Sequence, residues 1–423
     1  MNRTRLPLAW RPALAMALLL CGQAQANDTA AHEAWVPAST LVAPVLHASP
    51  AIQAARAQQA ARLQRARGVE AGSAEWTLRL NQQQRRAQDP SAQRFAETSL
   101  ALERPLRLWG KADLDAQLAT QDRETARIGL ADALHEASRQ LLQQWFEALR
   151  AQLEVDNAAR EQELAATLQR QAQVRLRQGD ISRLDVNLAD AEWQRAQAAA
   201  ALAQVQQASA LAQLQRLYPG LPTPRWPERP EAGSLRDAAL EPALQDFLQH
   251  QHELNLLKSE VQRQQLQADR LERDRRPDPT VGLFGARERA GAEQLLGVSL
   301  ALPLSGVHRE SLALAASAEA EAARQRVQLR EQQLSAEFES RWRQVQQQER
   351  ALQALRQAAA TQREAADKSF KAYSLGEHSM TELIQNRRLA KEQQLASDRL
   401  LLDLVQAQAL IALDRHQLWD LDD

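Results

Sequence analysis

The feature that most constrains the fold is a pair of matching interruptions in long stretches of helix-forming sequence. The first is Gly179 followed by Ser182, and the second is Gly376 followed by Ser379, which repeats the same spacing 197 residues later. Glycine favours the left-handed backbone that ends a helix, and serine is a preferred N-cap of the next helix. Because each connection is so short, the two helices that it joins must run antiparallel. The sequence therefore predicts two helical hairpins.

An acidic residue follows each N-cap serine at the spacing of a capping box. Asp185 stands three residues after Ser182, and Glu382 stands three residues after Ser379. In a capping box, the serine hydroxyl and the acidic side chain each accept a hydrogen bond from a backbone N–H that would otherwise be unpaired. We therefore expect both carboxylates to cap helices, whatever else they do.

Four short segments depart from the helical period and predict β-strands: 76–81, 96–103, 280–285 and 296–302. In 76–81, 96–103 and 296–302 apolar and polar residues alternate, which places the apolar side chains of each strand on one face. Around them the helical period predicts helices over residues 51–68 and 243–275, whereas residues up to Ser49 predict no defined element.

The second half of the chain repeats the first, which indicates an internal duplication. Pro303 and Leu304, for example, follow Pro105 and Leu106 by 198 residues. The predicted parts are a signal peptide (1–26), a first repeat (27–219) with strands at about 75–104 and a helical hairpin at about 106–217, a Pro-rich linker (220–240), and a second repeat (241–423) with strands at about 279–303 and a helical hairpin at about 307–418.

The composition fits an elongated helical protein. Only 14 of 423 residues are glycine and aromatic residues make up 4%, so the chain is poor in turns and in large core side chains. The mean hydropathy of −0.51 and the lack of another long apolar run exclude membrane-spanning helices. The net charge of −1 gives no basic excess for binding nucleic acid.

The first 26 residues have the pattern of a secretory signal peptide. Arg3, Arg5 and Arg11 form a positive region, Ala13–Cys21 is too short an apolar run to span a bilayer, and the small residues Ala24 and Ala26, two positions apart, suit cleavage. The mature chain would then lack its single cysteine, and its stability must come from packing. In the alternative interpretation, Cys21 is the acylated residue of a lipoprotein.

If the four predicted strands form one open sheet, its two outer edges have no partner strand. An open sheet in lipid leaves backbone groups unpaired, and the smallest membrane barrels have about eight strands. Two or more chains must therefore share one barrel if the strands lie in a membrane. In the alternative, the strands form a soluble β-layer that caps a helical stalk.

The order of these elements resembles the TolC family of outer-membrane efflux ducts. The resemblance covers essentially the whole mature chain, and its markers include the strand motif at 276–284 and the motif at 300–304. Within the family, the chain looks most like the CzcC and CusC heavy-metal branch. The predicted fold class is therefore mainly α with a small β part, made of a duplicated unit of helix, strand hairpin and long helical hairpin.

The resemblance implies a homotrimer in the cell outer membrane, with a twelve-stranded β-barrel continued by a periplasmic tunnel of twelve helices. The implied partners are outer-membrane lipid, a periplasmic membrane-fusion adaptor and an inner-membrane pump of the RND type. The implied function is passive conduction of pumped substrate, heavy-metal cations in the branch named above, to the outside. Drug efflux and type I protein secretion stay open as alternatives, as does a structural periplasmic coiled-coil protein.

The resemblance also assigns roles to the hairpin turns. The turns would form the periplasmic entrance and dock the adaptor through Gly179, Asp180, Ser182, Gly376, Glu377, His378 and Ser379. Asp185 and Glu382 would form the acidic gate of the aperture, although Leu188 and Gln385 stand where a second acid could be. Near the turn, Tyr373 and His378 either contact the adaptor or are simply solvated. The segment at 72–75 also departs from the family, because relatives carry proline there.

Nothing in the sequence suggests an enzyme. The nucleophile, phosphate-loop and zinc-protease motifs are missing, and a conduit needs none of them. His250 and His252 have the look of a metal pair, but residues two apart on a predicted helix point to different faces. We therefore expect no catalytic residue, no cofactor and no bound metal.

Overall fold

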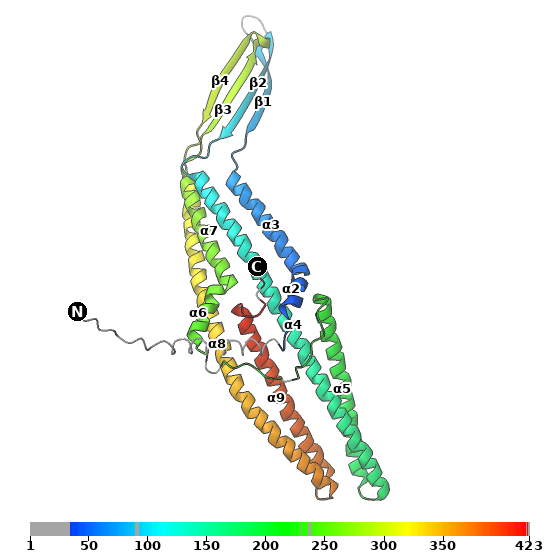
Figure 1. Ribbon diagram of the computed structural model, residues 1–423. Coiled ribbons are helices and arrows are strands. Elements are labelled where there is room, and N and C mark those ends of the chain that lie inside the picture. The colour runs from blue at the N-terminus through cyan, green and yellow to red at the C-terminus, as the bar shows by residue number, and fades with distance from the viewer. Residues whose placement is uncertain (1–33, 89–92, 229, 236–237, 420, 422–423) are drawn as a thin grey trace, which may run out of the picture. The chain divides into compact units, whose positions relative to one another are not determined.

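The computed structural model describes residues 34–88, 93–228, 230–235, 238–419 and 421 of the 423-residue chain (Figure 1). The predicted signal peptide, with Cys21 and its candidate cleavage site, lies outside the described residues. Within the described part, no helix combines the length and the apolar character needed to cross a membrane.

The chain divides into two compact units, each built from separate stretches of sequence. Unit 1 comprises residues 1–53, 134–251 and 334–423, and unit 2 comprises residues 54–133 and 252–333. Two long helices, α4 (Lys111–Gln178) and α8 (Val307–Ser374), pass from one unit into the other.

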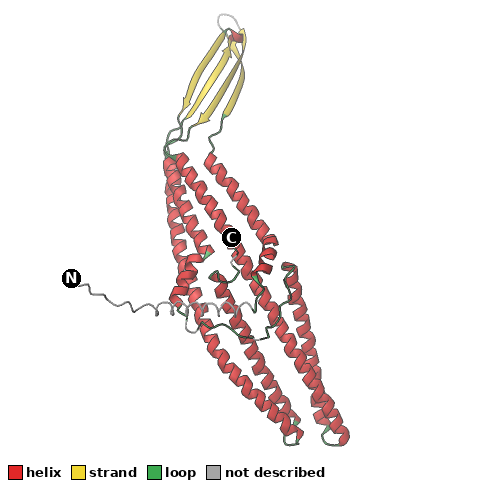
Figure 2. Ribbon diagram, viewed as in Figure 1, coloured by secondary structure: helices red, strands yellow, loops and turns green. Residues whose placement is uncertain are grey.

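Unit 1 is helical and contains the two predicted hairpins (Figure 2). The end of α4 is followed by α5 (Arg183–Leu217), and the end of α8 is followed by α9 (Met380–Asp414). Both turns lie at the same end of the unit in Figure 1. The hairpins match in length, since α4 and α8 have 68 residues each and α5 and α9 have 35 each.

A shared apolar cluster joins the two hairpins close to their turns. It contains Leu168 and Ala172 of α4, Val186 and Ala189 of α5, Tyr373 of α8, and Met380, Leu383 and Ile384 of α9. Small alanines let helix backbones approach closely, and each buried large side chain contributes about 1.5–3 kcal/mol. Nearer the start of α4, Leu142, Phe146, Leu149 and Leu153 form an apolar stripe, and all four are buried.

Unit 1 also contains two shorter helices, α2 (Ser39–Ala48) and α6 (Leu240–His250). No defined element was expected before Ser49, and this expectation is wrong. Pro44 lies inside α2, and proline ordinarily argues against a helix. Val42 and Leu46, one helical turn apart, are both fully buried, and this packing outweighs the loss of one backbone hydrogen bond.

Unit 2 combines α3 (Pro50–Ala71, of which the first turn belongs to unit 1), α7 (His252–Asp274) and a sheet. The strands are β1 (Thr77–Ala87), β2 (Gln93–Pro105), β3 (Thr280–Glu288) and β4 (Glu293–Ala301), with the short helix η1 (Arg289–Gly291) between the last two. They form one antiparallel sheet in the order β1-β2-β3-β4 (Figure 1). The four predicted strands are confirmed, and β1 is longer than expected because it continues through the polar residues 82–87.

The helix predicted over 243–275 is interrupted. Gln251 has an extended backbone, with φ −65° and ψ 110°, and separates α6 from α7. Its neighbours carry no glycine or proline that would signal a break. Gln251 is itself buried, so tertiary packing overrides the local preference for a continuous helix.

Candidate functional site

The first hairpin turn is held by backbone hydrogen bonds around Gly179. Gly179 has φ 82°, its N–H donates to the carbonyl of Leu176 at 3.0 Å, and the Asp180 N–H donates to the carbonyl of Arg175 at 2.9 Å. Two such bonds satisfy carbonyl groups at the helix end that would otherwise be unpaired. The left-handed cap predicted from the glycine is therefore confirmed.

The next helix starts with the predicted capping box. The Asp185 N–H donates to the Ser182 hydroxyl at 3.2 Å, and the Ser182 N–H donates to the Asp185 carboxylate at 3.1 Å. The Ser182 hydroxyl also donates to the same carboxylate oxygen, Oδ2, at 2.7 Å. Asp185 is thus engaged as a helix cap through a single carboxylate oxygen.

The second turn repeats this arrangement. Gly376 has φ 81°, the Glu377 N–H donates to the carbonyl of Ala372 at 2.9 Å, and the Ser379 N–H donates to Glu382 Oε2 at 2.8 Å. The hydrogen bonds from the Ser379 backbone and hydroxyl favour the ionised carboxylate and lower the pKa of Glu382. Glu382 is exposed and charged at neutral pH while it caps α9.

Most of the turn residues named from the sequence are exposed. Gly179, Asp180, Ser182, Gly376, Glu377 and Ser379 are all exposed, and His378 is half-buried. The Nδ1 atom of His378 lies 3.3 Å from the hydroxyl of the buried Ser369. The two turns therefore offer a polar surface with small side chains and exposed acidic groups, which suits contact with another protein.

Tyr373 lies beneath this surface rather than on it. It is 6% exposed, and the guanidinium of Arg175 stacks 5.0 Å from the centre of its ring. Arg175 also donates to the carbonyl of Tyr373 at 3.3 Å. Neither a solvated nor a surface-contact role for Tyr373 fits this burial, because the side chain packs in the cluster that joins the hairpins.

An ion-pair cluster that the sequence did not reveal also links the hairpins. Glu192 of α5 is almost completely buried and accepts hydrogen bonds from Arg195 of α5 and Arg388 of α9. Burial favours the protonated carboxyl, but the hydrogen bonds and charges of the two arginines outweigh it and lower the pKa of Glu192 to about 2. Glu192 therefore carries a full negative charge in the folded protein at neutral pH.

In unit 2, one face of the sheet is apolar and exposed. Cross-strand register places Leu78 opposite Leu102, Leu80 opposite Leu100, and Leu283 opposite Val298 on the same face. Exposure is high, with 68% for Leu80, 78% for Val298 and 89% for Leu296. A continuous apolar patch of this kind marks a contact with another molecule or with lipid.

In the half of the sheet formed by β1 and β2, the opposite face is polar and internally paired. Arg79 forms an ion pair with Glu103 at 3.2 Å, Asn81 donates to Ser99 at 3.4 Å, and Arg85 pairs with Glu97 at 3.0 Å. β1 and β2 therefore separate an apolar face from a hydrogen-bonded polar face, as the alternation in the sequence predicted, whereas the second face of β3 and β4 carries Phe284, Ala286 and Leu295.

A buried lysine at the start of α4 contacts the end of α7 and the segment before β3. Lys111 is fully buried and pairs with Asp274 at 3.0 Å and with Asp278 at 2.9 Å. Two exposed tryptophans lie in the same part of unit 2, with Arg104 over the ring of Trp76 and Arg276 over that of Trp109. Tryptophans are enriched at membrane–water interfaces, so this end of the sheet has the side chains of an interfacial belt.

The sequence matches no protein-family model and no curated protein. The fold does match solved structures. The outer membrane protein VceC from Vibrio cholerae is 16% identical over 90% of this chain and 95% of that chain, with a TM-score of 0.71. The outer-membrane channel OprN is 17% identical over 90% of each chain, with a TM-score of 0.76.

CusC, a protein whose structures describe folding and transmembrane channel formation, is 14% identical over 89% of this chain and 90% of that chain, with a TM-score of 0.67. The chain therefore has the fold of these proteins over nearly its whole length. The resemblance predicted from the sequence is confirmed at the level of the fold, as is the mainly helical class with a small antiparallel sheet.

Proposed function

We propose that the protein is one subunit of an outer-membrane efflux duct, with its sheet in the membrane and its helical hairpins in the periplasm. The main support for this proposal is the exposed apolar face of the sheet, which lies opposite the paired polar face of β1 and β2. A barrel in lipid needs apolar side chains outward and tolerates polar side chains inward. The shared fold with solved outer-membrane channels supports the same role.

Closure of the barrel requires further copies of the chain. The outer edges of β1 and β4 have no partner strand within the described sheet, and unpaired backbone groups are costly in lipid. Three copies would supply twelve strands and remove every edge. Together with the family resemblance, this supports a homotrimer with a twelve-stranded barrel and a tunnel of twelve helices.

We also propose that the chain arose by internal duplication, with repeats at 27–219 and 241–423 joined by the linker at 220–240. Support comes from the near-constant sequence offset and from the equal lengths of the paired helices. In a trimer, two similar hairpins per chain would give a tunnel wall of nearly equivalent parts.

The exposed hairpin turns are the proposed docking surface for a periplasmic membrane-fusion adaptor, which would link the duct to an inner-membrane pump. The docking residues would be Gly179, Asp180, Ser182, Gly376, Glu377, His378 and Ser379. Asp185 and Glu382 would add a ring of negative charge at the aperture. This gate is compatible with their capping role, because the Glu382 side chain stays exposed while it caps.

For the substrate, we favour heavy-metal cations. The strand motif at 276–284 resembles the heavy-metal branch, and CusC, named in that branch, is among the proteins with this fold. Drug export and protein secretion through the same kind of duct are the competing assignments. Export assays with metal salts and with drugs, in cells that carry the matching adaptor and pump, distinguish them.

Cell fractionation and mass measurement test the proposed function. We expect the protein in the outer-membrane fraction, and as a trimer by light scattering after extraction in detergent. Recovery of a stable monomer in the soluble periplasm would contradict the duct and support a structural periplasmic protein. Planar-bilayer recording on the extracted trimer then checks for conductance.

A further inference from the structure

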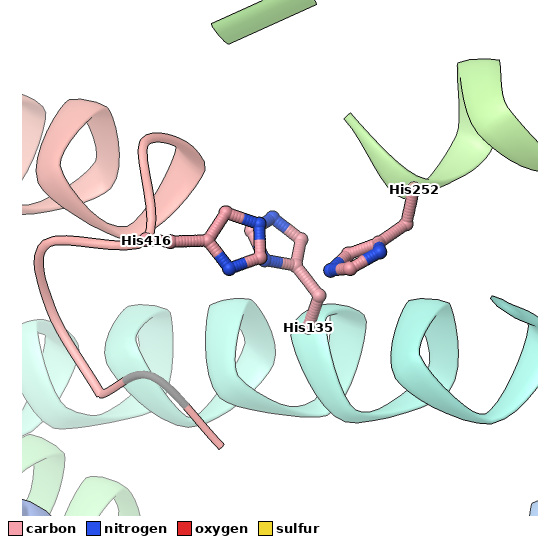
Figure 3. Close-up of side chains that lie close together, drawn as sticks. All are labelled: His135, His252 and His416. Atoms are coloured by element: carbon pink, nitrogen blue, oxygen red, sulfur yellow. The ribbon is translucent and has the colours of Figure 1, made fainter. Parts of the chain in front are cut away.

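Three histidine side chains meet in unit 1 at the end of α9. His416 stands two residues after the last residue of α9, His135 lies in α4, and His250 is the last residue of α6. The ring of His416 lies 5.7 Å from that of His135, nearly parallel to it, and 5.7 Å from that of His250. Figure 3 draws His135 and His416, as well as His252, the residue with which the second stretch of unit 2 begins.

A ring nitrogen of His135 lies within 4.8 Å of a ring nitrogen of His416. Two imidazoles that share one ion in tetrahedral geometry have nitrogens roughly 3.4 Å apart, given metal–nitrogen bonds of about 2.1 Å. A small rotation of either ring would shorten the nitrogen–nitrogen distance to the value that a shared ion requires. The two side chains are therefore placed for a shared ion without movement of the helices.

The backbone at His416 is held in a left-handed conformation that few residues with a side chain adopt. Its φ is 55°, and the bonds from His416 N–H to Leu413 and from Gln417 N–H to Ala412, at 3.0 and 2.8 Å, end α9 there. Glycine or asparagine is the common choice at such a position. Side chains kept at a conformational cost concentrate at functional positions, and the imidazole is the only group that His416 adds over glycine.

Two of the three histidines have the supporting partners that metal ligands commonly have. His135 Nε2 lies 3.3 Å from the Asp414 carboxylate, and His250 Nδ1 lies 2.9 Å from the carbonyl of Asp246, to which it must donate. A ligating imidazole usually interacts through its other nitrogen with a carboxylate or a carbonyl, which fixes the ring orientation.

The nearby carboxylates are already occupied by arginines. Asp414 pairs with Arg139 and Arg341, and Asp246 pairs with Arg415. Imidazole nitrogens are therefore the ligand atoms that this site would offer to a metal ion. They suit zinc, copper and nickel rather than magnesium or calcium. Three guanidinium groups against two carboxylates also make the surroundings slightly positive, so the affinity should be lower than that of a closed structural zinc site.

A small cavity of about 10 Å³ is lined by His135 and His416 together with Leu413, Leu418 and Trp419. This volume is close to the space that one water molecule requires, and therefore suits a single ion. Its apolar wall would shield the ion from solvent, which strengthens its attraction to the imidazoles.

We propose that His135 and His416 bind one divalent transition-metal ion, with the ring of His250 next to that of His416, and that the ion fastens the segment after α9 to α4. This site is separate from the hairpin turns and from the sheet, and it does not depend on what the duct exports. It differs from the expectation drawn from the sequence, in which no metal was bound.

Zinc binding to the full-length protein in detergent tests the proposal. After treatment with a chelator, the protein is titrated with zinc chloride in a calorimeter, and bound zinc is counted by elemental analysis. We expect one zinc per chain and a rise in the melting temperature. His135→Ala should weaken zinc binding at least tenfold, whereas the matched control His378→Ala, which removes a histidine at the second hairpin turn, should leave it unchanged.

His416→Gly separates the metal site from a merely structural role. Glycine relieves the backbone strain, so the metal-free variant should melt at the same temperature as the parent or above it, but zinc should no longer raise that temperature. A His416→Gly variant that binds zinc as tightly as the parent would overturn the proposal. So would a parent protein that binds no zinc at a tenfold excess of the metal.

Discussion

The carboxylate of Glu192 on α5 accepts hydrogen bonds from the guanidinium of Arg388 on α9, so an ion pair joins the two helical hairpins. The pair joins the two helices that follow the exposed turns, and the shared apolar cluster contains residues of both helices. Relative motion of the hairpins must therefore break or rearrange this ion pair. The pair is the most direct link between the stability of the hairpins and any opening at their turns.

Glu192→Gln should destabilise the folded protein by about 1 kcal/mol at neutral pH. The figure is modest because Arg388 is half exposed and the pair is partly screened by water. The measurement is thermal unfolding of the helical signal by circular dichroism. An unchanged melting temperature at pH 7 would show that the pair contributes nothing to stability.

The same pair gives a dependence on pH. The pKa of Glu192 is lowered from its ordinary value of 4.5 to about 2, so its stabilising effect is complete above pH 4.5 and is lost as the pH falls toward 2. The difference in melting temperature between the parent and Glu192→Gln should therefore shrink over this range. A difference that stayed constant down to pH 2 would contradict the assignment.

Lys111 should be essential for holding the start of α4 against the end of α7 and the segment before β3. Lys111→Met would leave Asp274 and Asp278 without their shared cation, and we expect a loss of about 2–3 kcal/mol, since breaking a buried ion pair is costly and both aspartates are partly exposed. The matched control is Lys258→Met, on the exposed surface of α7. Equal melting temperatures of the two variants would argue against this role.

The glycines of the hairpin turns should matter for export rather than for assembly. Valine at position 376 has space, because no atom lies within 4 Å of the place that its Cβ would occupy, but it must adopt a positive φ at a cost of about 1 kcal/mol or more. Gly376→Val and Gly179→Val should lower export with normal amounts of trimer. Gly306→Val, which also has space but no positive φ, is the control and should export normally.

Normal export by Gly376→Val, with the protein present at parental levels in the outer membrane, would contradict the proposed docking role of the turns.

Glu382→Gln distinguishes a cap from a gate. Glutamine can still accept the hydrogen bond from the Ser379 N–H, so the stability of α9 should change little. If three Glu382 carboxylates line the aperture, removal of their charge should change single-channel conductance and cation preference, more strongly at low salt than at high salt. Asp185→Asn tests the first turn in the same way.

Planar-bilayer recording is the measurement for both variants. Parental conductance in Glu382→Gln, in Asp185→Asn and in the double variant would remove the acidic gate and leave the caps.

Local sequence patterns were sufficient to predict the hairpin turns and to predict which side chains share a face of each alternating strand. The Gly179 and Gly376 caps and their serine capping boxes depend on residues at most a few positions apart, and alternation at 76–81 fixes which side chains share a face. Spacing alone could therefore predict them.

Features that depend on distant partners could not be predicted in this way. The pairing of Glu192 with Arg388 and of Lys111 with Asp274 joins residues far apart in the chain, and neither pair leaves a local pattern. The break at Gln251 arises from burial rather than from a helix-breaking residue. His416 looked like one histidine among eight, because its positive φ and its neighbours exist only in the folded chain.

Two pairs of substitutions test whether the apolar face of the sheet contacts lipid. Leu80 and Leu100 are cross-strand partners on the apolar face, whereas Asn81 and Ser99 are partners one position along on the polar face. Lysine at both positions of a pair brings the same like-charge repulsion to either face. Only the apolar face adds the cost of charge in lipid, about 2–4 kcal/mol per lysine near the centre of the bilayer.

The measurement is the amount of trimer recovered from the outer membrane. We expect Leu80→Lys with Leu100→Lys to abolish assembly, and Asn81→Lys with Ser99→Lys to assemble close to the parental level. Normal outer-membrane trimer from the leucine pair, or equal loss from both pairs, would contradict a lipid-facing sheet.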